Sequence, residues 1–499
     1  MKLFDHILEH ACKKPRALAL SGSGIDLDYL GLVVEVYRVA VKLRKLRITT
    51  LGLDMDNGPL WVLFDLAAAS MGITIVPIPP FFSNQQVQHS LQQAGVQVVV
   101  SDNPEFLKSR ALNTVANSWV DLQVLKQKVF LINAFGDGGS VPADVAKVTY
   151  TSGTTGEPKG VMLPWGRIEA VVESLVTTVE VRGSDRHLAL MPLSVLLENI
   201  AGLYVSFWIG ATAVIPPLAE TGLKGAAGLD AVAMLRVIEN SKATSVIMTP
   251  QSLQSMVELI EQGSPQPEQL RFIAVGGAAV SLQLLARARR LNLPVFEGYG
   301  LSECASVTTL NSSSHYKVGS VGRPLPHTQL RIADDGEVLV SGNLFAGYLG
   351  ETEPQLQGGW WHTGDIGYLD QDGFLYLKGR RRNIFITAYG RNVSPEWVER
   401  ELVLEKTIIQ AAVFGEAKPW NVAVVVAMPS ATAEDLAASI ARVNTALPDY
   451  ARVSRWIIAY EPFTPLNRQL SGTGRIRRQD IYQAYQHQIE SLYQEELVS

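Results

Sequence analysis

Residues 148–164, VTYTSGTTGEPKGVMLP, place hydroxyl side chains and glycines ahead of one lysine. The middle of this run has no bulky apolar side chain, so it does not serve core packing. Its backbone N–H groups, hydroxyls and the ammonium of Lys159 together suit a chain of phosphate oxygens. The spacing of Gly153, Gly156 and Lys159 differs from the Walker pattern G-x-x-x-x-G-K-[ST]. We interpret the run as a phosphate-binding loop of another kind, with a flexible surface turn as the alternative.

Strand-like apolar runs alternate with helical patterns between about residues 140 and 300. The runs with strand character are AKVTYT, HLALMP, ATAVIP, SVIMTP, RFIAVGG and LPVFEGYG. This alternation predicts parallel sheets covered by helices, and ligands of such sheets lie beyond the carboxyl ends of the strands. The polar segments TSGTTG, GGAA and GYGLSE all follow strand-like runs, so we expect one crevice to collect them.

Composition excludes several classes of protein. The 499 residues allow two or three domains, and the formal net charge of -5 argues against a general nucleic-acid binder. The two cysteines, Cys12 and Cys304, lack metal-ligand spacing, which argues against a zinc site and favours a reducing compartment.

The apolar stretch 66–82 contains three prolines and is shorter than the roughly 20 residues that span a bilayer. A helix followed by a buried strand fits this stretch better. The amino-terminal residues predict an amphipathic helix and not a signal peptide. We therefore expect a cytoplasmic protein without a transmembrane segment.

The motif set resembles the signature of the AMP-binding, adenylate-forming superfamily, which includes acyl-CoA synthetases, luciferases and peptide-synthetase adenylation domains. Besides YTSGTTGEPKGVML, the matching segments are GGAAV (276–280), EGYGLSE (297–303), VGRPLP (321–326), WHTGDIGYLDQDGFLYLKGR (361–380) and YGRNVSPEWVE (389–399). The resemblance covers essentially the whole chain. It implies an α/β fold, with a large domain of helix-covered sheets (1–380) and a small mobile α+β domain (381–499). The hinge is expected at Arg380–Asn383.

The resemblance also implies a nucleotide site. Lys159 and the hydroxyls before it would hold the β- and γ-phosphates of ATP, Tyr299 would stack on adenine, and Asp365 would accept both ribose hydroxyls. Glu303 would bind Mg²⁺. The residues expected to contact ATP or AMP are Thr151, Ser152, Gly153, Thr154, Thr155, Lys159, Gly277, Ala278, Glu297, Gly298, Tyr299, Gly300, Leu301, Ser302, Asp365 and Arg380.

Further positions follow from the same comparison of motifs. Catalytic roles are expected for Lys159, Glu303, Arg380 and Arg475, and Arg382 would be the hinge residue. Gly390 would let the pantetheine arm of coenzyme A pass. The expected acyl pocket contains Val195, Asn199, Thr249 and Gly276. Val195 stands where many relatives carry histidine or an aromatic residue, which suggests an apolar entrance, although packing in the core is the alternative.

The implied reaction has two halves: a carboxylate and ATP give acyl-AMP and pyrophosphate, and a thiol then displaces AMP. Three segments, FEGYGLSE, GRNVSPEWVE and FTPLNRQLSGTGRIRR (463–478), look most like the long-chain fatty acyl-CoA synthetase branch. Arg475 replaces the lysine that normally contacts both the carboxylate and the α-phosphate. The expected substrates are ATP with Mg²⁺, a hydrophobic acid and coenzyme A. The alternatives are transfer to a carrier-protein phosphopantetheine or an amine, and a nucleotide-binding relative with impaired catalysis.

Overall fold

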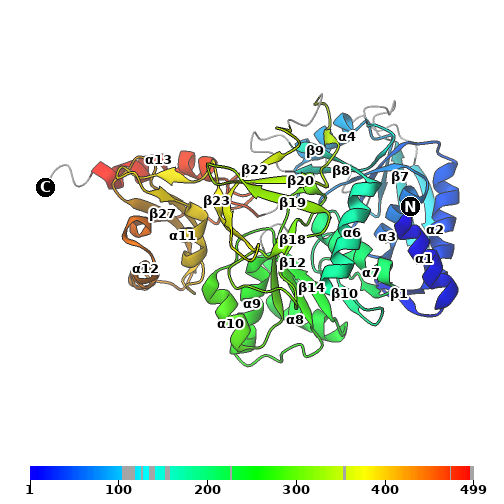
Figure 1. Ribbon diagram of the computed structural model, residues 1–499, viewed down its shortest axis with the longest axis horizontal. Coiled ribbons are helices and arrows are strands. Elements are labelled where there is room, and N and C mark those ends of the chain that lie inside the picture. The colour runs from blue at the N-terminus through cyan, green and yellow to red at the C-terminus, as the bar shows by residue number, and fades with distance from the viewer. Residues whose placement is uncertain are drawn as a thin grey trace.

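The computed structural model describes residues 1–103, 119–124, 127–133, 141–151, 158–224, 228–351, 356–471 and 474–494. Figure 1 shows an elongated molecule in which the C-terminal domain forms one end and the amino-terminal helices lie at the other. The expected alternation of parallel strands and helices is confirmed in the large domain.

The first sheet of the large domain has the strand order β21-β9-β8-β4-β3-β5-β7-β6. Strands β5, β3, β4 and β8 are parallel to one another, whereas β9 returns antiparallel to β8 and pairs Lys159 with Thr151. The bounds are β3 (Thr50–Asp54), β4 (Thr74–Pro77), β5 (Val98–Ser101), β6 (Trp119–Val124), β7 (Gln127–Asn133), β8 (Val145–Thr151), β9 (Lys159–Pro164) and β21 (Gly347–Tyr348).

The second sheet has the order β18-β17-β16-β15-β14-β10-β11-β1-β2, and its strands from β16 to β1 are parallel. One large core cluster packs both sheets onto the helices between them. The bounds are β1 (Leu18–Gly22), β2 (Ile25–Asp28), β10 (Arg186–Leu188), β11 (Thr212–Val214), β14 (Ser245–Met248), β15 (Phe272–Val275), β16 (Val295–Tyr299), β17 (Thr309–Leu310) and β18 (Arg323–Pro324).

Helices cover these sheets as the apolar spacing predicts, and the stretch 66–82 holds the end of α3 followed by the buried strand β4. No helix in the described ranges is long and apolar enough to cross a membrane. The helices are α1 (Lys2–Lys13), α2 (Tyr29–Arg44), α3 (Pro59–Ser70), α4 (Asn84–Gln93), α6 (Trp165–Val179), the π-helix η1 (Leu197–Tyr204), α7 (Val205–Ile209), α8 (Ala231–Asn240), α9 (Pro250–Glu261) and α10 (Leu282–Arg290).

A third, antiparallel sheet leads toward the C-terminal domain, which packs its own three-stranded sheet against helices. The third sheet contains β19 (Thr328–Ile332), β20 (Glu337–Gly342), β22 (Trp361–Leu369) and β23 (Leu375–Arg380). The C-terminal domain contains β24 (Phe385–Ile386), β25 (Asn392–Val393), α11 (Pro395–Leu402), β26 (Ile408–Phe414), β27 (Asn421–Ala427), α12 (Ala433–Ala446), β28 (Val453–Ile458) and α13 (Arg478–Gln494). The domain boundary at Arg380–Asn383 stays a prediction.

A buried ion pair lies between α3 and β8. Lys147 and Asp65 are both fully buried, Asp65 also accepts the hydroxyl proton of Tyr204, and the ammonium lies over the rings of Tyr204 and Trp61. Burial lowers the pKa of Lys147, and the negative charge of Asp65 opposes this shift. Each of the two buried charges is therefore compensated by the other, and removing one partner leaves the other charge unpaired.

We expect Asp65→Ala to lower the free energy of unfolding by about 3–5 kcal/mol, because it leaves the Lys147 ammonium buried without its carboxylate. Glu173→Ala is the control, since it removes an exposed ion pair with Lys2 and should cost less than about 1 kcal/mol. Urea unfolding of both variants measures the difference. An equal loss of unfolding free energy in the two variants would contradict this expectation.

Candidate functional site

The candidate site lies at the carboxyl ends of β15 and β16, which are neighbours in the second sheet. Gly277, just beyond β15, has a φ of +83°, a left-handed conformation that glycine adopts without strain. Beyond β16, a Cβ on Gly300 would lie 1.6 Å from the carbonyl oxygen of Ser306, so that turn also requires glycine. The two turns bring backbone groups to the edge where ligands of parallel sheets bind.

The centre of the site is the carboxyl group of Asp365 on β22, which is 7% exposed. Tyr299 donates its hydroxyl proton to Oδ2 over 2.6 Å, and Nε of Arg380 lies 2.9 Å from Oδ1. Burial raises the pKa of Asp365, whereas the charge of Arg380 and the hydrogen bond from Tyr299 oppose this shift. Each carboxylate oxygen has a second lone pair, so both can still accept a ligand hydroxyl.

Cations from both domains converge on this carboxyl group. Arg380 also donates to the carbonyl oxygen of Thr363, and Nη2 of Arg475, from the C-terminal domain, donates to the carbonyl oxygen of Gly277 over 3.2 Å. Arg475 interacts electrostatically with Arg380, Arg382, Asp365 and Glu303. Three guanidinium groups thus face two carboxylates, and this excess of positive charge suits a polyanion such as a nucleotide phosphate chain.

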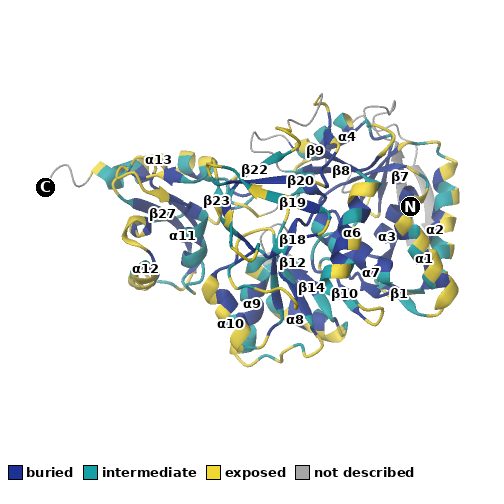
Figure 2. Ribbon diagram, in the orientation of Figure 1, coloured by how far each residue is buried: buried dark blue, intermediate teal, exposed yellow. Residues whose placement is uncertain are grey.

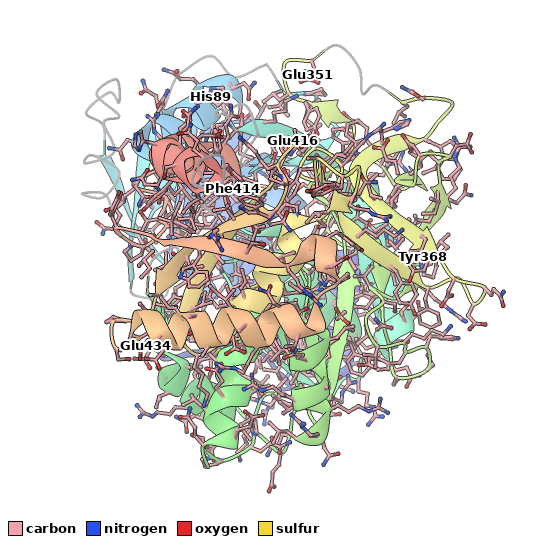
Figure 3. The ribbon with its side chains drawn as sticks, turned by 90° about the vertical axis from the view of Figure 1, so that its left-hand side faces the viewer. His89, Glu351, Tyr368, Phe414, Glu416 and Glu434 are labelled. Atoms are coloured by element: carbon pink, nitrogen blue, oxygen red, sulfur yellow. The ribbon has the colours of Figure 1, made fainter. Side chains whose placement is uncertain are left out.

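A second group of side chains links the first sheet to Glu303. Tyr348 on β21 donates its hydroxyl proton to Oε1 of Glu303 over 2.6 Å. The ammonium of Lys159 lies 4.6 Å from the centre of the Tyr348 ring and 2.8 Å from Oε1 of Glu351. Figure 3, viewed from the side of the C-terminal domain, shows Glu351 at the upper edge, well above Glu434 of α12. Neither Tyr348 nor Glu351 was predicted from the sequence.

The backbone is strained just after the turn that carries Glu303. Glu303 lies in a single 3₁₀ turn, Ser302–Cys304, and the next two residues, Ala305 and Ser306, have φ angles of 56° and 103°. Non-glycine residues in such conformations cost of order 1–3 kcal/mol each and cluster at ligand sites. The turn fixes the direction in which the Glu303 carboxyl points.

The carboxyl group of Glu303 offers the oxygen ligands that Mg²⁺ takes in proteins. No cluster of three potential metal ligands occurs among the residues that the structure describes. Mg²⁺ commonly takes one or two carboxylates and completes its shell with substrate phosphates and water, so Glu303 beside a triphosphate meets that requirement. The ion would supply charge neutralisation of the phosphates.

Some of the remaining predicted nucleotide contacts lie within the described residues, and others lie outside them. Thr151 ends β8 opposite Lys159, and Gly298 lies in β16, where a Cβ would come within 2.9 Å of Leu310. Ala278, Leu301 and Ser302 belong to the two turns at the strand ends. The predicted phosphate contacts Ser152, Gly153, Thr154 and Thr155 lie outside the described residues.

Three of the predicted acyl residues, Val195, Asn199 and Gly276, lie in or beside the π-helix η1. Leu197 of this helix is the side chain nearest to Gly276, with Cδ2 3.7 Å from the position of an added Cβ. Val195 is half-buried, Asn199 is 1% exposed, and Nδ2 of Asn199 has no hydrogen-bond partner among the described residues. Thr249 caps α9 by accepting from the N–H of Ser252 over 3.2 Å.

The C-terminal domain carries the other two predicted positions. Arg382 is exposed, two residues beyond the end of β23. Gly390 has a φ of +73° in the tight hairpin between β24 and β25, and no atom lies within 4 Å of an added Cβ. The surface beside Gly390 is therefore open to a ligand.

Two family models together match most of the chain. The model described as AMP-binding enzyme matches residues 7–351, and the model of the AMP-binding enzyme C-terminal domain matches residues 382–497. The chain belongs to the AMP-binding enzyme family. It is an AMP-forming acid–thiol ligase by family, and the expected adenylate-forming fold is confirmed.

Similar proteins of known type include two ligases. The chain is 26% identical to the long-chain-fatty-acid–CoA ligase FadD15 of Mycobacterium bovis, over 87% of this chain and 86% of that protein. It is 30% identical to a 2-succinylbenzoate–CoA ligase of Bacillus mycoides, over 74% and 75% of the two chains. The structure of o-succinylbenzoate CoA synthetase from Bacillus subtilis with ATP and a magnesium ion has a TM-score of 0.76 at 24% identity, covering 95% of this chain and 98% of that one.

Glu297, which was expected at the nucleotide, has its carboxyl group buried and accepts a hydrogen bond from the N–H of Gly319. Burial raises its pKa from 4.5 to about 8, although the charge of Arg400 opposes the shift. Between these two values the native protein binds more protons than the unfolded chain, so this group's contribution to stability falls as pH rises.

We expect Glu297→Gln to remove this pH dependence, because the amide does not ionise. The free energy of unfolding of the variant, relative to the wild type, should rise from pH 5 to pH 8 by at most about 1.4 kcal/mol per pH unit. Denaturant unfolding across that range measures it. A difference between the two proteins that is independent of pH would contradict the raised pKa.

Proposed function

We propose that this enzyme activates a hydrophobic carboxylic acid, of the fatty-acid type, with ATP and transfers the acyl group to coenzyme A. A cavity of about 60 Å³ behind η1, lined mainly by apolar side chains with Asp185, His187 and Arg271 among its polar ones, supports this choice of acid. Its walls include Leu175, Leu197, Ala201, Phe272 and Leu310. Hydrophobic side chains of this kind bind a hydrocarbon tail by removing its surface from water.

The cavity lies beside the candidate site. Leu197 lines the cavity and also lies beside Gly276, at the carboxyl end of β15. Along β15 the lining residues run from Ala274 to Arg271, a distance of about 10 Å at roughly 3.3 Å per residue. The cavity ends at the ion pair of Arg271 with Asp185. A tail that passes Leu197 would therefore leave its carboxylate near the site cations.

The proposed first half-reaction follows from the charges of the site. A carboxylate oxygen attacks the α-phosphorus of ATP, and the bond to the bridging oxygen breaks to release pyrophosphate. Asp365 would hold the ribose, and Arg475 would lie between the carboxylate and the α-phosphate. A guanidinium can donate to two oxyanions at once, so it can reduce their repulsion as they approach.

In the second half-reaction the thiolate of coenzyme A attacks the acyl carbonyl carbon, and AMP leaves with its phosphate oxygen. The open backbone turn at Gly390 supports passage of the pantetheine arm past this part of the C-terminal domain. Transfer to a carrier-protein phosphopantetheine or to an amine uses the same acyl-AMP. Product formation with coenzyme A, a phosphopantetheinylated carrier and amines separates these acceptors.

Pyrophosphate release should depend on the added acid and should favour octanoate over acetate. In Ala201→Trp the indole would fill the cavity, so we expect kcat/KM for octanoate relative to acetate to fall about 10-fold or more. Ala201→Ser is the control for an altered but small side chain. No release with any carboxylic acid would refute the proposed function, whereas an unchanged preference in Ala201→Trp would refute the cavity as the tail site.

Arg475→Ala should lower the rate of acyl-AMP formation by about 100-fold or more, because it removes the cation nearest both oxyanions. Arg475→Lys retains the charge and should recover most of this rate. Arg477→Ala is the matched control, since that side chain pairs with Asp480. Thioester formation from supplied acyl-AMP should change little in Arg475→Ala. Equal loss in both half-reactions would contradict an assignment to the first one.

A further inference from the structure

Helix α2 exposes a line of large apolar side chains. Leu30, Val34, Tyr37 and Val41 are 52%, 38%, 68% and 38% exposed. Their spacing of four, three and four residues places them on one face of the helix, which we call the α2 stripe. The opposite face carries the buried residues Tyr29, Leu32, Val36, Val39 and Leu43. A helix with one buried face normally presents polar residues to solvent, so the apolar α2 stripe is unusual on an exposed helix face.

Basic residues border the α2 stripe. Arg38, Arg44 and Lys45 are exposed, and their positions on the helix place them beside the stripe on either side. Glu35 is the acidic residue of this helix, and its side chain is only 12% exposed and forms an ion pair with Arg38. Residues 1–50 contain nine Lys and Arg against five Asp and Glu, although the whole chain has a net charge of -5.

The α2 stripe lies far from the C-terminal domain. Figure 1 shows α2 along the outer edge of the large domain, at the opposite end of the molecule from α12 and α13. Figure 2 shows exposed segments along this edge. A flat partner could therefore contact α2 without touching the C-terminal domain or the cations of the candidate site.

We propose that the α2 stripe docks onto the surface of a bilayer that contains anionic lipids. Apolar side chains beside lysine and arginine are the combination that binds such a surface, and tyrosine is enriched at the interface between lipid and water. Each basic residue near an anionic bilayer strengthens binding. Contact between two copies of this face would bring identical cations together, which disfavours self-association as the explanation.

Flotation with lipid vesicles tests this proposal without any substrate. The wild-type protein should float with vesicles of phosphatidylcholine and phosphatidylglycerol, should remain behind with phosphatidylcholine alone, and should be released by high salt. Leu30→Ser/Tyr37→Ser should abolish flotation. Arg38→Gln/Arg44→Gln/Lys45→Gln should weaken binding to the anionic vesicles roughly 100-fold.

The matched control is Val232→Ser/Leu466→Ser, which removes two other exposed apolar side chains and should float like the wild type. Circular dichroism and thermal unfolding establish that each variant is folded. Wild-type protein that stays in solution with anionic vesicles would overturn the proposal, as would unchanged flotation of Leu30→Ser/Tyr37→Ser. A dimer in sedimentation experiments that Tyr37→Ser dissociates would instead assign the stripe to a second copy.

Discussion

The site depends on one buried carboxyl group that joins three strands. Asp365 on β22 holds Tyr299 at the end of β16 and Arg380 at the end of β23, so the second and third sheets are connected through its two oxygens. Burial opposes its ionisation, whereas Arg380 and the Tyr299 hydroxyl favour the charged form. The carboxyl group therefore orders its neighbours and keeps lone pairs for a ligand. The turns at Gly277 and Gly300 bring backbone to the same place.

The C-terminal domain completes the site. Arg475 reaches the carbonyl oxygen of Gly277, while Ser281 contacts Glu401 and Gln254 contacts the carbonyl oxygen of Val403 across the domain interface. Three arginines near one another repel, and a bound polyanion would reduce this repulsion. This docked arrangement suits formation of acyl-AMP, because it places the Arg475 cation beside Gly277 and the proposed nucleotide site. We expect the second half-reaction to require a different placement of the domain.

Sequence patterns predicted the strand–helix alternation, and the structure brings the motif residues Tyr299, Asp365 and Arg380 together. The alternation could be predicted because apolar runs and the turns between them are local features, whereas Tyr299, Asp365 and Arg380 were identified by family resemblance, and their roles at the nucleotide stay predictions. The contacts of Lys159 with Tyr348 and Glu351 join segments about 190 residues apart, so no local pattern could predict them. The sequence also did not indicate that Glu297 is buried, because alternation along a strand does not say which face is covered.

We propose that a nucleotide binds between Asp365 and Arg475, with its ribose on the first and its α-phosphate near the second. A crystal structure with a non-hydrolysable ATP analogue tests this most directly. We expect the ribose hydroxyls to lie within hydrogen-bond distance of Asp365, with the adenine against Tyr299. An analogue bound elsewhere on the chain, with Asp365 still contacting only Tyr299 and Arg380, would contradict it.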